Sequence, residues 1–554
     1  MKSISLYIFG ALIFVFAVTF TDAKYWGDSA DYVDSVIFFE HGKNYNFWEF
    51  GHLLWRPLGW LVWTKIYHST EGGFWRSEIA SVFQYLSYFA GFASTLILVG
   101  ILKKLKVSAW IIAVTVFSFI FSHAFINYTQ TANSYISALM FYFLGLSFSL
   151  SETKENNFLY SILSGICLAL TLCFWMPFLW AIPAVIVTPL VLHGFNQQKI
   201  FEAAGKIASF LLALTLFYGI ALAVLQIDDL SKLRLWITAA AHGDETRGIM
   251  RMIFGFGRSF VEMGNDGLLF KRFMLKDPFN PVSFGELING SICKLAAFYS
   301  LAAGVLFLLW QKSPNKKIFI LLLTAALPVI AFASFSAGGE IEWYLAIFPF
   351  AFIGLAVALQ VAEWKISRSA MLIILAIFAL ININAFSVWT IAKEQEKMVA
   401  RINLLESKAK PKDTIFLVNW ADDLINFNRS FPFHSINIAG NLRLNAIVTP
   451  GTAQTKQWRE EFAARSLFAW EKEKNVWLSN RAFSARPKAD WNWAEGDDKN
   501  VGWHEFPEFL SKLEIGEILG DENGFTLILP SETNKRLLQQ YQEQLREPIE
   551  HYNF

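Results

Sequence analysis

Residues 21–60 hold the densest group of side chains in this chain that can do polar chemistry. Two carboxylates, Asp28 and Asp31, lie three positions apart directly after a hydrophobic segment. If this stretch is helical, the spacing places both on one face of the helix. Two close carboxylates push their proton affinities apart, so one of them can act as a general base near neutral pH. A helix cap formed by Asp28 or Ser29 is the structural alternative.

The segment continues with an aromatic stretch, FWEFGHLLWRPLGW, that contains His52 and Arg56. Arg56 lies between apolar neighbours, where a cation is unfavourable unless it meets an anion. Its planar guanidinium suits phosphate oxygens, and a lipid phosphate at the membrane surface is the natural partner. We expect His52 to hydrogen-bond phosphate or sugar. Snorkelling of Arg56 to phospholipid headgroups is the alternative.

The elements that must position these residues are membrane helices. Of the 554 residues, 54% are hydrophobic and 17% are charged, more apolar surface than one soluble core needs. The net charge of +1 argues against nucleic acid as a partner. Apolar segments of about 20 residues predict about eleven transmembrane helices. They are expected near 4–20, 78–100, 107–126, 135–150, 158–173, 177–194, 207–226, 292–310, 318–336, 343–361 and 370–388.

Basic residues in the short loops predict the orientation. Lys and Arg gather in alternate loops, whereas the loops at 127–134, 174–176 and 336–342 contain none. Because cytoplasmic loops are rich in Lys and Arg, we expect the amino terminus in the cytoplasm. The loops 21–77 and 227–291 then lie on the periplasmic side of the plasma (inner) membrane. Residues 1–23 also fit a secretory signal peptide, but we expect them to be retained as the first span.

The composition changes after the last apolar segment. Residues 389–554 are mixed and charged, with short apolar runs at Thr414–Val418, Asn475–Leu478 and Phe525–Leu529. Helical segments lie between these runs, and this alternation predicts a small α/β domain. The expected architecture is therefore an α-helical polytopic membrane domain, residues 1–388, followed by an extracytoplasmic α/β domain.

Four further polar residues are expected at the outer membrane face. Asn133 and Tyr135 open the fourth span, where a helix cap is the alternative role for Asn133. Glu342 and Tyr344 open the tenth span, where an ordinary acidic interfacial turn is the alternative. All four are candidates for binding the substrate.

The 227–291 loop is longer than the topology requires, and long loops tend to be functional. Three of its basic residues can follow one another along a helix face: Arg247, Arg251 and Arg258. They predict a basic strip for a lipid phosphate, and an amphipathic helix on anionic headgroups is the alternative. His242, Asp244 and Glu245 form a weak metal candidate, because carboxylates suit Mg²⁺ or Mn²⁺.

The motif Asp28-Ser29-Ala30-Asp31, followed by Gly51-His52 and Arg56-Pro57, resembles the first-loop motifs of GT-C glycosyltransferases. The nearest branch reads D-S-G-E and then G-H-P-P. Here Asp31 replaces the Glu, Ala30 replaces the Gly, and the Pro pair is absent. Protein O-mannosyltransferases and lipid A aminoarabinose transferases are similar in layout. The resemblance implies an integral membrane enzyme that takes a sugar from a polyprenyl-phosphate carrier.

Such an enzyme would transfer the sugar, with inversion, to a hydroxyl of a protein, lipid or glycan at the outer face. The resemblance assigns Asp28 as the base, with Asp31 holding Asp28 or binding the acceptor. The arginines would stabilise the departing polyprenyl phosphate. A divalent metal is the one cofactor that stays open. A polyprenyl-linked glycan flippase and an O-antigen-type polymerase are alternatives, although a flippase needs charges along a path through the bilayer.

Overall fold

The computed structural model describes residues 3–43, 46–66, 75–151, 157–239, 248–263, 273, 282–311, 315–336, 338–362, 365–410, 413–418, 443–447, 458–484 and 509–542. Contacts between residues divide the chain into two units. The first consists of residues 1–267 and 290–391, and the second of residues 268–289 and 392–554.

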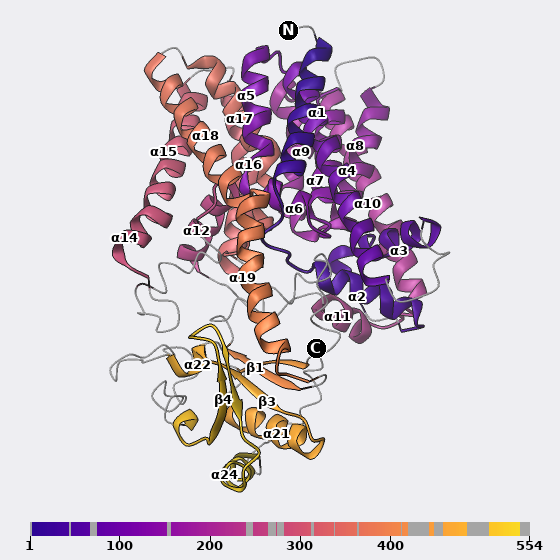
Figure 1. The fold of residues 1–554 in the computed structure, drawn as a ribbon. Coiled ribbons are helices and arrows are strands. Elements are labelled where there is room, and N and C mark those ends of the chain that lie inside the picture. Colours follow the sequence, from indigo (N-terminus) through magenta and orange to yellow (C-terminus); the bar gives the residue numbers. More distant parts are fainter. Residues whose placement is uncertain are drawn as a thin grey trace. The chain divides into compact units, whose positions relative to one another are not determined.

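Helices make up almost all of the described part of the first unit (Figure 1). They are α1 (Ser3–Phe20), α2 (Ser29–Glu40), α3 (Trp55–Ile66), α4 (Trp75–Lys104), α5 (Ala109–Ile120), α6 (His123–Thr129), α7 (Tyr135–Ser149), α8 (Asn157–Phe174), α9 (Ile182–His193), α10 (Gln197–Val224), α11 (Leu230–Ala239), α12 (Ile249–Phe260), α15 (Cys293–Gln311), α16 (Lys316–Phe335), α17 (Phe348–Val361) and α18 (Lys365–Phe386). Short 3₁₀ helices cover Phe50–His52 (η1), Met176–Trp180 (η2) and Glu342–Ile347 (η5). Every range in which a span is expected contains a helix.

Seven helical segments of the described residues are long and apolar enough to cross a membrane. They are 78–104, 176–193, 197–224, 284–311, 316–335, 342–361 and 367–386. Helices α5 and α6, bent by 63°, form an eighth segment if they are counted together. The apolar helices 4–20, 135–149 and 158–174 are shorter. A helical membrane protein is thus confirmed in outline, while the number of crossings stays a prediction.

Helices α7 to α10 show how a break in one span is stabilised. The long apolar stretch divides after Phe174, between the spans expected near 158–173 and 177–194. Further on, Pro189 lies inside α9 and has no N–H, so the carbonyl of Val185 loses its helical partner. Ser149 Oγ and Lys206 Nζ donate to that carbonyl over 3.1 and 3.2 Å. The fully buried Lys206 ammonium therefore helps to replace the hydrogen bond that is lost at Pro189, and it links α7, α9 and α10.

The loop after α1 leads to α2 and α3, which lie at the end of this unit away from the amino terminus (Figure 1). Both helices pack against α4 and against each other. Their inward faces carry large side chains that are almost fully buried, among them Tyr32, Trp55 and Trp63. Burying such rings contributes several kcal/mol, roughly 1.5–3 kcal/mol each. This packing fixes the segment that carries the acidic motif.

The second unit contains a five-stranded sheet in the order β2-β1-β3-β5-β4. Its strands are β1 (Thr414–Val418), β2 (Arg443–Ile447), β3 (Val476–Ser479), β4 (Ile515–Leu519) and β5 (Phe525–Ile528). Strand β1 runs parallel to β2 and β3, while β5 pairs antiparallel with β3 and β4. The helices of this part are α14 (Phe284–Leu287), α19 (Val388–Glu406, which begins in the first unit), α21 (Trp458–Glu471), α22 (Arg481–Ser484) and α24 (Glu532–Gln542).

Alternation along β1 gives this sheet two apolar faces. Phe416 packs with Phe462 of α21 and Leu538 of α24. Ile415 packs on the other face with Ile402 of α19. Side chains of a strand point to opposite faces in turn, so each face needs its own helical cover. The predicted apolar runs are indeed strands, and the small C-terminal sheet is confirmed.

Candidate active site

Asp28 lies half-buried immediately before α2. Its Oδ2 atom accepts hydrogen bonds from Tyr135 Oη at 3.0 Å and from Tyr32 Oη at 3.5 Å. Asp28 is the N-cap residue of α2, but its side chain makes no capping hydrogen bond. Two neutral phenols therefore hold one carboxylate oxygen in place. Such a carboxylate can accept a proton from a hydroxyl group that reaches it.

Asp31 lies one turn further along α2 and is exposed. Its backbone carbonyl accepts a hydrogen bond from Ser35 Oγ at 2.7 Å. The structure thus gives the two acidic residues of the motif different surroundings, one held by tyrosines and the other open to solvent.

Asn133 fixes the loop that leads into Asp28. Its Nδ2 donates to the carbonyl of Trp26 at 2.8 Å and to Ser29 Oγ at 3.1 Å. Gly27, between them, has φ of +53°, and a Cβ there would lie 3.3 Å from the Asn133 amide. A side chain at this position would be both strained and crowded. Asn133, which caps no helix here, is therefore a positioning residue for Asp28.

Asn127 holds the same loop one step earlier. Its Oδ1 accepts from the backbone N–H groups of Lys24 and Tyr25, at 3.0 and 2.9 Å, and its Nδ2 donates to the Tyr25 carbonyl at 2.7 Å. An asparagine side chain can match a backbone amide in this way because it carries both a donor and an acceptor. Helix α6 and the loop before α7 thus hold the acidic loop at two points.

His52 is buried in an aromatic cluster rather than exposed to a ligand. Its Nδ1 lies 2.7 Å from Ser134 Oγ, its Nε2 lies 3.0 Å from Tyr32 Oη, and its ring stacks on Trp175 at 4.6 Å. Burial lowers the pKa of His52 below its ordinary 6.5. The imidazole is therefore neutral and orients Tyr32, one of the two phenols on Asp28. Direct contact of His52 with phosphate or sugar stays a prediction.

Arg56 meets an anion, as expected, but the anion belongs to the protein. Its guanidinium forms a buried ion pair with Glu49 and lies 4.6 Å from the centre of the Tyr32 ring. The sequence reasoning missed Glu49, although it is the one acidic residue in the FWEFGHLLWRPLGW stretch. A buried cation requires such compensation. Arg56 thus packs behind Tyr32, and its role as a phosphate ligand stays a prediction.

Glu342 joins the site through a second tyrosine. Tyr128 Oη donates to Glu342 Oε2 at 2.7 Å, and the Tyr128 ring packs edge-on against Tyr135 at 4.9 Å. Tyr128 and Tyr135 thus form a packed pair, and their hydroxyls donate to two different carboxylates, Glu342 and Asp28. Tyr344 is fully buried and donates to the carbonyl of Gly338 at 2.8 Å. It supports the turn before Glu342.

Helix α12 brings two arginines to the same region. Arg258 is buried, and its Nη1 donates to the carbonyl of Gly339 at 3.3 Å. Arg251, seven residues or about two helical turns before Arg258, is half-buried. The backbones approach closely here, because a Cβ on Gly255 would lie 2.0 Å from the carbonyl oxygen of Gly338. Arg247 lies outside the described residues, so the predicted strip is reduced to two members.

Glu340 links these arginines electrostatically to Asp28. Protein atoms surround its carboxyl group and raise its pKa; Arg258 and Arg251 lower it, and Asp28 raises it. The residue nevertheless exposes more than a third of its surface. Asp28 and both arginines therefore act electrostatically on one exposed carboxylate.

A second polar cluster, which the sequence reasoning missed, surrounds Glu262. Tyr25 Oη donates to Glu262 Oε1 at 2.9 Å, and His123 Nε2 lies 3.2 Å from Oε2. Burial raises the pKa of Glu262, but His123, Lys24 and Arg258 outweigh it and hold that pKa below 4.5. The sequence gives no indication that a lone acidic residue after a helix will contact residues as distant as Tyr25 and His123.

No protein-family model matches this chain, and no curated protein matches it in sequence. The chain is structurally similar to ArnT from Cupriavidus metallidurans, an aminoarabinose transferase of the GT-C class. Two crystal structures of ArnT were compared, one bound to undecaprenyl phosphate and one in the apo state. Each alignment covers 96% of this chain and 98% of ArnT at 10% identity, with a TM-score of 0.48.

A divalent metal stays an untested expectation. Among the residues that the structure describes, no three His, Cys, Asp or Glu side chains come together as a metal site. The candidates His242, Asp244 and Glu245 lie outside the described residues. The described site brings together a positioned carboxylate, supporting tyrosines and nearby arginines.

Proposed function

We propose that this protein is an integral membrane glycosyltransferase that moves a sugar from a polyprenyl-phosphate carrier to an acceptor hydroxyl. The observation that carries the proposal is the Asp28 carboxylate, which is held by two phenols and acts together with Arg251 and Arg258 on the Glu340 carboxyl group. The first-loop motif, which resembles that of GT-C glycosyltransferases, points to the same chemistry. The outer membrane face is the expected place of reaction.

In the proposed reaction Asp28 accepts the proton of the acceptor hydroxyl. The acceptor oxygen attacks the anomeric carbon, and the bond from that carbon to the phosphate oxygen breaks. The bonding electrons leave with the phosphate, whose growing negative charge needs nearby cations. Arg251 is open enough to contact that phosphate, whereas the buried Arg258 acts through its charge. Exposed Asp31 is suited to bind the acceptor.

The test is a transfer assay with the full chain in proteoliposomes and a panel of polyprenyl-phosphate sugars. We expect Asp28→Asn to lower kcat by about 10²–10⁴-fold, the usual contribution of a general base, without a loss of thermal stability. Asp34→Asn, the same change on α2, serves as the matched control and should leave kcat unchanged.

Transfer by Asp28→Asn at the wild-type rate would falsify the assignment of the base. A wild-type protein that moves the labelled carrier lipid across the bilayer, with no glycosidic product, instead identifies a flippase.

A further inference from the structure

A series of aromatic rings leads from the tyrosines around Asp28 to η5. The ring of Trp175 lies 4.7 Å from the ring of Tyr135, whose hydroxyl donates to Asp28. The ring of Trp343, the second residue of η5, lies edge-on to Trp175 with 5.9 Å between the ring centres. Both separations are those of packed aromatic pairs. Trp343 is thus two ring contacts away from a residue that holds the proposed base.

A second set of contacts joins the same two regions. The ring of Tyr128 packs on Tyr135, and its hydroxyl donates to Glu342, the residue before Trp343. The two sets of contacts share only Tyr135. Together they place the start of η5 close to Asp28.

The turn before η5 also meets the arginines of α12. Arg258 donates to the carbonyl of Gly339, and both Arg251 and Arg258 act with Asp28 on Glu340. In the proposed reaction the phosphate needs these cations, and the acceptor hydroxyl needs Asp28. The transferred sugar connects the two, because its anomeric carbon is bonded to the phosphate and attacked by the acceptor. The sugar therefore passes along this turn and the start of η5.

Trp343 offers such a sugar both an aromatic face and a hydrogen-bond donor. The residue is half-buried and stacks on Phe332 of α16 at 5.2 Å. Its indole N–H makes no hydrogen bond within the part of the chain that the structure describes. The face of an indole ring is electron-rich, so the C–H groups of a sugar ring pack on it favourably. The N–H group can donate to a sugar oxygen.

Trp175 gives an independent indication of a ligand. The residue is 8% exposed, and its buried N–H lacks a hydrogen-bond partner among the described residues. Leaving a buried donor without an acceptor costs free energy, so such a group in a native fold requires an explanation. An oxygen-rich molecule bound beside the two tryptophans provides the missing acceptor.

We propose that Trp343 determines the specificity for the transferred sugar, whose ring packs on its indole. The inference rests on the proposed function and names the residue that recognises the sugar part of the donor. The exposed carboxylate of Glu340 lies three residues earlier and accepts hydrogen bonds from the hydroxyls of the same sugar. An aromatic face with a few placed polar groups is the usual composition of a small-molecule site.

Trp180 of η2 provides a matched control. Its ring also stacks on Phe332, with 4.7 Å between the ring centres, and 37% of the residue is exposed. In the described part of the structure, no ring contact joins Trp180 to Trp175. Replacing Trp180 therefore removes a tryptophan from Phe332 without removing the proposed sugar contact.

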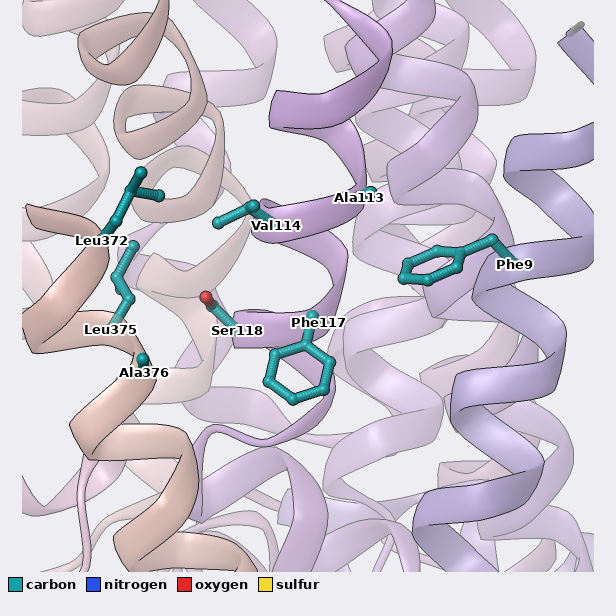
Figure 2. Close-up of a pocket in the computed structure, with 8 residues that line it drawn as sticks. All are labelled: Phe9, Ala113, Val114, Phe117, Ser118, Leu372, Leu375 and Ala376. Atoms are coloured by element: carbon teal, nitrogen blue, oxygen red, sulfur yellow. The ribbon is translucent and has the colours of Figure 1, made fainter. Parts of the chain in front are cut away.

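The groove between α1, α5 and α18 provides a second control (Figure 2). It has a volume of about 270 Å³, and the described residues that line it include Phe9, Leu372 and Leu375 but no charged side chain and no tryptophan. Ser118 contributes the one hydroxyl group of this lining. Such a lining suits a hydrocarbon chain, so filling the groove with Ala376→Trp should not affect a sugar.

The experiment measures binding without turnover, to the full chain in nanodiscs. The probes are undecaprenyl-phosphate glucose, galactose, mannose and arabinose, together with undecaprenyl methyl phosphate, which has the same phosphodiester charge but no sugar. The ratio of their Kd values to that of the sugar-free lipid gives the contribution of the sugar. We expect Trp343→Leu to reduce this ratio about tenfold and Trp343→Phe, which keeps an aromatic face, only a few-fold. Trp180→Leu and Ala376→Trp should leave it unchanged.

The outcomes separate this inference from the proposed function. A sugar contribution that falls in Trp343→Leu supports the sugar contact even if the wild type transfers no sugar, which would count only against the proposed reaction. An equal loss of the sugar-free lipid in Trp343→Leu identifies an interfacial anchor and overturns the proposal. So does a wild type that binds none of the four sugar lipids more tightly than the sugar-free lipid.

Discussion

Two carboxylates that are both held by tyrosine hydroxyls show what decides their chemistry. Asp28 is half-buried and receives hydrogen bonds from Tyr135 and Tyr32, which carry no charge. Glu262 is 5% exposed, accepts from Tyr25, and faces His123, Lys24 and Arg258, whose combined effect lowers its pKa. The nearest donors are alike, but the surrounding charge is not.

This difference assigns opposite roles to the two groups. The two phenols orient the Asp28 carboxylate, which can accept a proton from a hydroxyl that reaches it. Cations stabilise the ionised form of Glu262 and make it a poor base. We infer that Glu262 is a structural counter-ion and that Asp28 is available for catalysis. Each part of this comparison can be tested.

The largest expected effect is on stability, at Glu262. Glu262→Gln removes the negative charge that compensates the buried Arg258 and the half-buried Lys24, and leaving a buried charge uncompensated in this way costs about 3–5 kcal/mol of the free energy of unfolding. Thermal unfolding of the detergent-solubilised protein measures the loss. Asp28→Asn should unfold close to the wild type, because it removes no ion pair.

Asp228→Asn is the matched control for this change. It removes an exposed carboxylate that lies 2.6 Å from Lys232, and exposed pairs contribute little. If Glu262→Gln unfolds at the same temperature as the control, the contrast between a structural and a catalytic carboxylate is wrong.

A smaller effect is expected on catalysis, at the two phenols of Asp28. Tyr135→Phe removes the 3.0 Å hydrogen bond and should lower kcat about tenfold or more, since a hydrogen bond to a charged group contributes about 1.5–3 kcal/mol. Tyr32→Phe removes the longer 3.5 Å contact and should lower kcat only a few-fold. Transfer rates at saturating donor measure both.

Tyr142→Phe separates positioning of Asp28 from loss of a buried hydroxyl. Tyr142 is on the same helix as Tyr135, is fully buried, and donates to the carbonyl of Ala181 at 2.6 Å. Its variant should lose stability and keep kcat. An equal fall of kcat in Tyr142→Phe and Tyr135→Phe contradicts the role of Tyr135.

The sequence predicts the helices and the motif far better than the partners of the buried charges. Apolar length is a local property, so every expected span contains a helix. The ion pair of Arg56 with Glu49 was within reach, since both residues lie in one short stretch. The contacts of Glu262 with Tyr25 and His123 join segments far apart in the chain, and no local pattern encodes them. Solvent exposure, which separates Asp28 from Asp31, likewise depends on tertiary packing.

The smallest effect concerns pH and the neutral state of His52, on which the comparison depends. Burial lowers the pKa of His52 below 6.5, so as the pH falls through 6.5 the unfolded chain takes up a proton that the folded chain does not. The unfolded state binds more protons in that window, and the contribution of His52 to stability therefore decreases as the pH falls.

The His52→Gln variant lacks this pH-dependent contribution to stability. We expect the variant to be less stable than the wild type at pH 7 and the difference to narrow towards pH 5, by up to about 1.4 kcal/mol per pH unit. Unfolding curves of both proteins across this range measure the narrowing. A constant difference, or one that widens in acid, means that His52 is protonated in the fold, and its imidazole then adds a second cation, besides Arg56, to the residues around Tyr32.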